Sequence, residues 1–173
     1  LGDVYKRQVY PMNEQLKFYM VANYLMYKNG EFDDYDRYNK EMEANLADVL
    51  AQVEKDSDEW AYEYAKSKVV FWKEHKDLPH YFIGSGNQYG ATYSYAMCYW
   101  EEQMWIRTKS ISCQEFFHGM QEIIVEDTPV TLFMGEDEQR PLAERVAKFL
   151  PRVNANYTII DTKEHELKGI SPE

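Results

Sequence analysis

Short apolar segments alternate with helical periodicity over the second half of the chain. The apolar segments are the candidate strands, and they lie at residues 80–83, 111–113, 129–134 and 156–161. The helical stretches between them lie at residues 89–107, 115–125 and 141–150. Strands that alternate with helices build βαβ units. The sequence therefore predicts an α/β fold with a mostly parallel sheet flanked by helices.

The first half of the chain predicts helices only. Apolar residues at three- and four-residue spacing indicate a helix over residues 11–27, with Gly30 at its left-handed end. A second helix is expected over residues 35–55. A third begins after a cap at Asp56, with Glu59 as its capping-box partner. These helices form a helical lead-in to the α/β part rather than a complete domain.

Both ends of the chain are abrupt. Residues 1–8 show no periodicity that joins them to the rest, and residues 3–8 resemble the translation of a transposon end used in sequencing libraries. We interpret residues 1–8 as a sequencing scar, with an ordinary polar N-terminal segment as the alternative. Only a polar stub, Glu164–Glu173, follows the last predicted strand. The chain is thus expected to be a fragment cut at both ends.

Charge and composition exclude several classes of function. The 173 residues include 19 Lys and Arg against 30 Asp and Glu, a net charge of −11, which is the wrong sign for a nucleic-acid binder. The mean hydropathy is −0.66, and no apolar run resembles a membrane span or a signal peptide, so we expect a cytoplasmic protein. The two cysteines make no disulfide framework and the four histidines have no ligand spacing, so no metal site is expected.

A glycine-rich loop, GSGNQYG at residues 84–90, follows the first predicted strand. Such a loop can hold a phosphate or carboxylate on its backbone N–H groups. Ligands of parallel sheets bind beyond the carboxyl ends of the strands, where this loop and Gly135 are expected. We therefore predict Gly84, Ser85 and Gly86 as substrate-binding residues. The alternatives are a tight turn without a ligand and a dinucleotide site, although the spacing is not G-x-G-x-x-G.

Glu101 and Glu102 are adjacent carboxylates in an aromatic helix. Their side chains point about 100° apart, so at most one can face the core side with Trp105. A carboxylate in a desolvated pocket acquires the raised pKa that a general base near neutral pH needs. The alternative is a solvated pair on the rim of the helix.

The segment EFFHG at residues 115–119 places His118 between aromatic residues and a glycine. This pattern indicates an imidazole exposed to a cavity, with a structural histidine as the alternative. Cys98 and Cys113 would be candidate thiol nucleophiles, but their flanks do not resemble a nucleophile elbow. Buried apolar cysteines are therefore favoured.

Together these elements resemble the second domain of the double sugar-isomerase (SIS) family. The resemblance rests on the strand–GSG–helix element, the helix with Glu102, the E-x-x-H-G motif at residues 115–119, and the strand PVTLFM. The interval from Glu102 to His118 is 16 residues, which also fits. The family includes the isomerase half of glucosamine-6-phosphate synthase and the fructosamine deglycases. Residues 105–106 and 140–145 fit the deglycase branch better.

The resemblance covers about residues 10–161 and implies a flavodoxin-like SIS fold with a domain division. The parts are the last helix of a first SIS domain at residues 9–30, inter-domain helices at 31–76, and a C-terminally truncated second SIS domain at 77–173. Met120 departs from the family pattern, which has proline after the His-Gly pair, and this loosens the turn that carries His118.

The resemblance implies an aldose–ketose type of reaction on an open-chain 6-phosphosugar. Glu102 matches the general base between C1 and C2. His118 matches a histidine that assists ring opening and reaches a neighbouring subunit's site, and Glu115 is assigned to substrate binding. The deglycase branch implies a homodimer without a cofactor that releases glucose 6-phosphate and a free amine from a fructosamine 6-phosphate, such as fructoselysine 6-phosphate. The alternatives are an aminotransferase that forms glucosamine 6-phosphate and a non-catalytic module that senses sugar phosphates.

Overall fold

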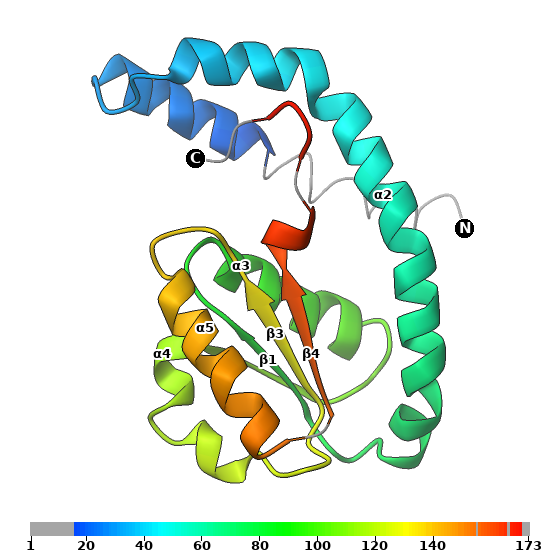
Figure 1. Ribbon diagram of the computed structural model, residues 1–173. Helices are drawn as coiled ribbons and strands as arrows, with labels where there is room; N and C mark the ends of the chain where they lie inside the picture. The colour runs from blue at the N-terminus through cyan, green and yellow to red at the C-terminus, as the bar shows by residue number, and fades with distance from the viewer. Residues whose placement is uncertain (1–15, 155, 166, 171–173) are drawn as a thin grey trace. The chain divides into compact units, whose positions relative to one another are not determined.

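The computed structural model describes residues 16–154, 156–165 and 167–170 (Figure 1). The chain divides into two compact units. Unit 1 contains the residues up to Lys55 and from Leu167 onward, and unit 2 is Asp56–Glu166. The predicted scar at residues 1–8 lies outside the described residues. Within the described ranges, none of the helices has the length and apolar character needed to cross a membrane.

Unit 2 is built on a four-stranded sheet in which every neighbouring pair is parallel. Its strands are β1 (His80–Gly84), β2 (Thr108–Ser112), β3 (Val130–Met134) and β4 (Tyr157–Asp161). Their spatial order is β2-β1-β3-β4. The four predicted strands and the parallel α/β sheet are confirmed.

Helices cover both faces of this sheet (Figure 1). One face carries α4 (Cys113–Phe116), η2 (Met120–Ile123), α5 (Arg140–Phe149) and η3 (Leu150–Arg152). The other carries α3 (Asn87–Ser94) and the π-helix η1 (Tyr95–Glu101). A short helix, η4 (Thr162–His165), follows β4.

The sequences of β1 and β3 explain why these strands are central. HYFIG and VTLFM are mostly apolar and buried along most of their length, as strands covered on both faces must be. Successive side chains point to opposite faces. Ile83 therefore enters the core beneath α4 and α5, whereas Phe82 packs with Ala96 and Trp100 of η1 in a second core.

The helix predicted over residues 89–107 ends earlier than expected. η1 stops at Glu101, and Trp105 has a left-handed φ of 57°. A non-glycine residue in this conformation is strained and cannot continue a right-handed helix. Trp105 is 89% exposed, so its expected place in the core is wrong, and Trp100 fills the core at 2% exposure.

α2 (Tyr35–Glu74) is one continuous helix of 40 residues. The predicted break at Asp56 is therefore wrong. No glycine or proline occurs within α2, and a single Asp inside a helix costs less than about 1 kcal/mol, so nothing in the sequence forces an end. The helix before it covers residues 16–28 of unit 1 and is followed by Gly30 at φ 75°, as predicted.

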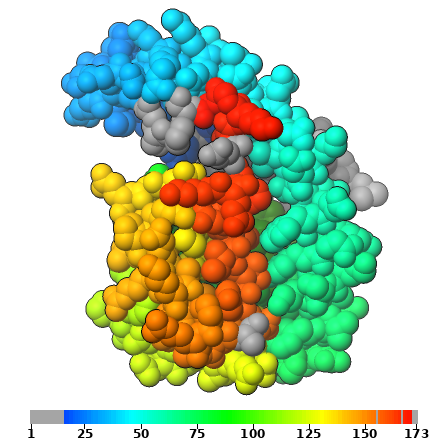
Figure 2. Space-filling view, viewed as in Figure 1, coloured from blue at the N-terminus to red at the C-terminus, as the bar shows by residue number. Residues whose placement is uncertain are grey.

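The part of α2 that belongs to unit 2 packs beside the sheet. Trp72 meets Trp100 edge to face with ring centroids 4.7 Å apart. Lys68 Nζ donates a hydrogen bond to Asn156 Oδ1 at 2.6 Å. Figure 2 shows this part of α2, in green, beside β4 in orange. These contacts make the C-terminal half of α2 part of the α/β unit.

His80 is a buried titratable residue in the second core. It is 2% exposed, and its ring centroid lies 4.4 Å from that of Phe82 and 4.3 Å from that of Trp100. Its Nε2 is hydrogen-bonded to Thr131 Oγ1 at 2.9 Å. Burial, assisted by the charge of Lys68, lowers the pKa of His80 to about 3. The imidazole is therefore neutral near pH 7.

This burial predicts that the fold loses stability as the pH falls below about 6.5. The unfolded chain protonates His80 near pH 6.5, whereas the folded chain does so only near pH 3. Between these values the free energy of unfolding should fall by about 1.4 kcal/mol per pH unit because of this residue. His80→Gln, which can still bond Thr131, should lack this contribution in urea unfolding at several pH values. His165→Gln, at an exposed position, should keep it, and an unchanged slope in His80→Gln would contradict the prediction.

Candidate functional site

The strand order creates a topological switch point between β1 and β3. The chain passes from β1 to β2 on one side and then returns to β3 on the other side of β1. In open parallel sheets, ligands bind beyond the carboxyl ends of the strands at such a point. The loops that meet there are residues 85–86 after β1 and residues 135–139 after β3. The predicted substrate-binding loop therefore lies at this edge of the sheet.

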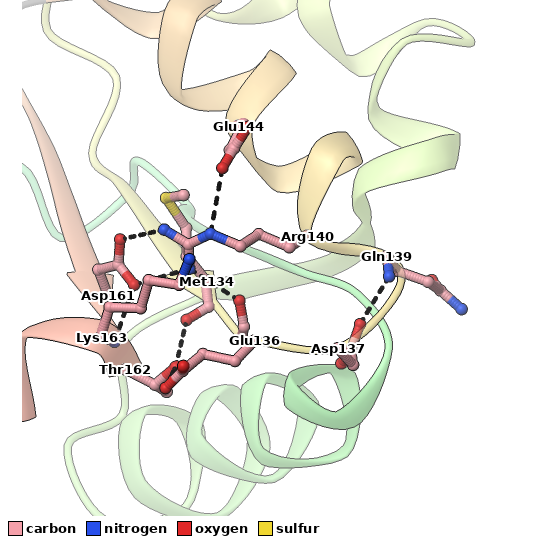
Figure 3. Close-up of polar contacts among 10 residues, drawn as sticks. Met134, Glu136, Asp137, Gln139, Arg140, Glu144, Asp161, Thr162 and Lys163 are labelled. Carbon is pink, nitrogen blue, oxygen red and sulfur yellow. Dashed lines mark hydrogen bonds and ion pairs between the residues drawn. The ribbon is translucent and has the colours of Figure 1, made fainter. Parts of the chain in front are cut away.

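Side chains of the chain itself already accept hydrogen bonds from the backbone N–H groups at this edge of the sheet. Asn87 N–H donates to Asp137 Oδ2 at 2.6 Å, and Gly86 N–H donates to Gln139 Oε1 at 3.1 Å. Asp137 Oδ1 also accepts from Gln139 N–H at 2.8 Å (Figure 3). Gln114 Nε2 donates to Gln139 Oε1 at 2.7 Å. The first turn of α3, where the sequence predicts an external anion, thus binds Asp137.

The two glycines of the loop permit close packing. A Cβ at Gly84 would collide with the side chain of Thr92, and a Cβ at Gly86 would collide with the Asp137 carboxylate. Gly86 also has a φ of 54°, which favours glycine. Ser85 is only 5% exposed. These contacts support the alternative of a tight strand-to-helix turn, and substrate binding by Gly84, Ser85 and Gly86 stays a prediction.

Asp137→Ala is expected to lower the free energy of unfolding by about 1–2 kcal/mol. The change leaves the Asn87 N–H without its acceptor and removes a negative charge beside the positive end of α3. Urea unfolding at neutral pH measures the loss. Glu138→Ala is the matched control, because Glu138 is exposed, and it should change the free energy by less than about 0.5 kcal/mol. Equal effects of the two changes would show that Asp137 does not hold the loops together.

A second polar cluster joins the ends of β3 and β4 (Figure 3). The Arg140 guanidinium donates from Nη1 to Asp161 Oδ1 at 2.9 Å and from Nη2 to Asp161 Oδ2 at 2.7 Å. Arg140 also donates to the Gly135 carbonyl at 2.9 Å and to Glu144 Oε1 at 3.1 Å. The hydrogen bonds from Arg140, assisted by its positive charge, hold the pKa of Asp161 below the usual value. This cluster links the carboxyl ends of β3 and β4.

Four contact residues at this edge were not predicted from the sequence. They are Asp137, Gln139, Arg140 and Asp161. A signal was present, because each lies at or just after the end of a predicted strand, and the carboxyl ends of parallel strands meet at one edge of a sheet. What the pattern does not indicate is that Arg140 and Asp137 are satisfied by partners within the chain.

Glu115 and His118 lie just after β2. β2 ends one residue before the predicted end, because Ser112 caps α4: its Oγ accepts from Glu115 N–H at 3.2 Å. The same Oγ donates to Glu115 Oε2 at 2.9 Å, so the Glu115 carboxylate is engaged in the cap. His118 is exposed in the turn after α4. Its imidazole has no hydrogen-bond partner among the described residues, and it is free to meet a ligand or another subunit.

Glu102 lies near the opposite edge of the sheet. It follows η1, where its N–H donates to the Met97 carbonyl at 3.0 Å, and its side chain is exposed. Neighbouring Glu101 instead accepts from Thr108 Oγ1, at the start of β2, at 2.6 Å. A cavity of about 620 Å³ adjoins this edge, with Glu101, Trp105 and Thr108 in its lining. Both Glu side chains are exposed, so the described part of one chain does not form the desolvated pocket expected for a general base.

The structure therefore separates the two predicted catalytic residues within one chain. Glu102 precedes β2 and His118 follows it, and the five residues of β2 span roughly 16 Å. Cys113 is buried, and burial raises the pKa of its thiol. This thiol is a core group rather than a nucleophile. A single copy of this chain brings no complete catalytic pair together among its described residues.

No family model matches the chain. Fructosamine deglycase FrlB of Bacillus subtilis is 29% identical over 142 residues, covering 82% of this chain and 40% of FrlB. A solved structure from Bacillus subtilis, assigned by name to the phosphosugar isomerases, is 28% identical over 82% of this chain with a TM-score of 0.67. The chain has the fold of an SIS domain.

Two further solved structures have the same SIS fold. One is from Salmonella typhimurium and is also assigned by name to the phosphosugar isomerases; it is 26% identical over 86% of this chain, with a TM-score of 0.72. The other is the C-terminal domain of glucosamine-fructose-6-phosphate aminotransferase from Francisella tularensis, 17% identical over 80% of this chain with a TM-score of 0.53, and it supports the fold alone. The predicted resemblance to the SIS family is confirmed. The chain spans only 38–44% of the length of these relatives.

Proposed function

We propose that the protein binds a 6-phosphosugar and removes the amine from a fructosamine 6-phosphate, releasing glucose 6-phosphate. The similarity to fructosamine deglycase FrlB over 82% of the chain carries this proposal. The open carboxylate of Glu102 and the open imidazole of His118 are the groups available for the chemistry. Fructoselysine 6-phosphate is the substrate that tests it first.

The reaction needs one base and one acid. Glu102 takes the proton from C1 of the open-chain substrate, the electron pair forms the C1–C2 double bond, and the C2 carbonyl oxygen takes up a proton, which gives an enaminol. Return of a proton to C2 and loss of the N–H proton then give an imine between C1 and the amine nitrogen. Water adds to C1, the C1–N bond breaks, and glucose 6-phosphate and the free amine leave. His118 moves the oxygen-borne proton during ring opening.

The proposed site is shared between two subunits. Glu102 precedes β2 and His118 follows it, so the two residues lie at opposite ends of this strand. One subunit therefore contributes the base and the other the imidazole. A homodimer then contains two equivalent sites. The phosphate is held elsewhere than on the first turn of α3, since Asp137 and Gln139 already bind the N–H groups of Gly86 and Asn87.

Residues 9–30, of which the structure describes a helix over 16–28, are proposed to be the last helix of a preceding SIS domain. This helix exposes large apolar side chains, including Phe18 at 73%, Val21 at 58% and Leu25 at 56%. An adjoining domain would bury such a surface. On this division, residues 31–76 are inter-domain helices and residues 77–173 are the second SIS domain.

A heterodimer experiment tests the shared site. Glu102→Gln and His118→Gln homodimers of the full-length protein should both be inactive. A heterodimer with one copy of each, isolated with two different tags, contains one intact site and should have about half of the wild-type activity. A heterodimer as inactive as its parents would contradict a shared site.

A product assay separates the proposed function from its alternatives. Full-length protein is given either fructoselysine 6-phosphate or fructose 6-phosphate with an ammonia source. A deglycase releases glucose 6-phosphate and lysine from the first, whereas an aminotransferase forms glucosamine 6-phosphate from the second. A sensing module binds sugar phosphates in calorimetry and converts neither, and this outcome would refute the enzyme proposal.

A further inference from the structure

A cationic cavity of about 460 Å³ lies in unit 2 between α5 and the turns that follow α4. Its lining includes Phe117, Gln121, Arg145, Lys148, Phe149 and Arg152. Among the described residues no carboxylate lines it, although the chain has a net charge of −11. Figure 2 shows α5 in orange beside the yellow-green segments after β2. A cavity of this size can hold a small molecule.

Three cations lie along one side of this cavity. Arg145, Lys148 and Arg152 are spaced by three and four residues, so they share one face of α5 and its continuation η3. None of them forms an ion pair within the described part of the chain. Like charges without counter-ions repel one another. The cluster is therefore an electrostatic match for a multiply charged anion.

Two aromatic rings also line the cavity. Phe117 and Phe149 meet edge to face with centroids 5.8 Å apart, and both are half-buried. The Arg145 guanidinium lies 4.1 Å from the centroid of the Phe117 ring. Stacking on the ring fixes the plane of the guanidinium, and its N–H groups stay available at the edge for a bidentate anion. Donors for an anion and an apolar surface for a flat group thus lie side by side.

We propose that this cavity binds a phosphorylated small molecule with a planar ring, of the nucleoside diphosphate class. The phosphoryl oxygens accept hydrogen bonds from Arg145, Lys148 and Arg152, and the ring packs against Phe117 and Phe149. Neither Glu102 nor His118 lines this cavity, and the proposal does not depend on the deglycase reaction. Free phosphate would use only the cations, and an uncharged nucleoside only the rings.

Calorimetric titration of the 173-residue chain at low salt tests this site with three probes: ADP, adenosine and inorganic phosphate. We expect ADP to bind with a Kd below about 1 mM, inorganic phosphate at least about tenfold more weakly, and adenosine without detectable heat. The affinity for ADP should fall as salt rises. A folded chain that does not bind ADP at millimolar concentration would overturn the proposal. Equal affinities for ADP and inorganic phosphate would overturn the role of the rings.

Variants locate the binding. Arg145→Gln and Lys148→Gln should each weaken ADP about fivefold. Phe149→Leu, which leaves the Arg145–Phe117 contact in place, should weaken ADP while the affinity for inorganic phosphate is kept. Lys109→Gln, the same charge change at an exposed position of β2, is the matched control and should bind like the wild type. Circular dichroism checks that each variant is folded, and ADP bound equally well when Arg145, Lys148 and Arg152 are all replaced by Gln would exclude this cavity.

Discussion

Glu102→Gln in the full-length protein should lower the turnover of fructoselysine 6-phosphate by about 10²–10⁴-fold. Glutamine has nearly the shape of glutamate, but its amide cannot accept the C1 proton. The Glu102 side chain is exposed and has no hydrogen-bond partner within the described residues, so the thermal midpoint should stay unchanged. The measurement is the steady-state release of glucose 6-phosphate, with the thermal midpoint determined on the same samples.

Glu101→Gln is the matched control for this change. Glu101 is the adjacent residue, and its carboxylate accepts a hydrogen bond from Thr108, which an amide oxygen can also accept. We expect Glu101→Gln to keep activity within about threefold of the wild type, since a surface hydrogen bond contributes little. Wild-type activity in Glu102→Gln would refute its role as the base. Equal losses in the two variants would indicate that only the conformation of this loop matters.

Arg140→Ala should lower the free energy of unfolding at pH 7 by about 3 kcal/mol. The two side chains of the ion pair are 14% and 17% exposed, so removal of Arg140 leaves the Asp161 carboxylate poorly solvated and without its bidentate partner. The Gly135 carbonyl also loses its donor. Urea unfolding at pH 7 measures the effect, and β4 should show the earliest loss of protection in hydrogen exchange.

The pH dependence distinguishes this ion pair from simple loss of packing. Arg140 lowers the pKa of Asp161 from 3.8, so the pair stabilises the fold above that pH and the contribution disappears as the pH falls through the lower folded-state pKa. The difference between Arg140→Ala and the wild type should therefore shrink in acid. Arg107→Ala is the control, because Arg107 and Asp77 form an ion pair that is 72% and 96% exposed, and such pairs contribute little. Equal losses in both variants would contradict the role of Arg140.

Local patterns in the sequence predicted the strands and their parallel arrangement. Short apolar runs such as PVTLFM have few options other than a buried strand, and the helical segments between them require parallel crossovers. The end of the first helix at Gly30 was also predictable, because it depends on a local pattern, one glycine and its neighbours. A wrong prediction at Asp56 arose because a capping residue permits a helix start without requiring one.

The arrangement of the candidate site was less predictable, because it depends on contacts between distant residues. Asp137 binds the backbone of Asn87, 50 positions earlier in the chain, and no local pattern indicates that pairing. The positive φ of Trp105 likewise places a tryptophan at the surface where helical spacing predicts a core residue. The separation of Glu102 and His118 by β2 follows from the topology alone. It was implied in advance only by the family resemblance.

The most direct test of the deglycase account is the fate of the C1 proton. Full-length protein is incubated with fructoselysine 6-phosphate in deuterated water, and the C1 proton signals of the substrate and the released glucose 6-phosphate are followed by NMR. A deglycase moves one C1 proton to C2 or exchanges it with solvent, and it releases lysine. Glu102→Gln should show neither the proton transfer or exchange nor the release of lysine. Substrate that binds to the wild-type protein but keeps both C1 protons and its lysine would contradict the deglycase account.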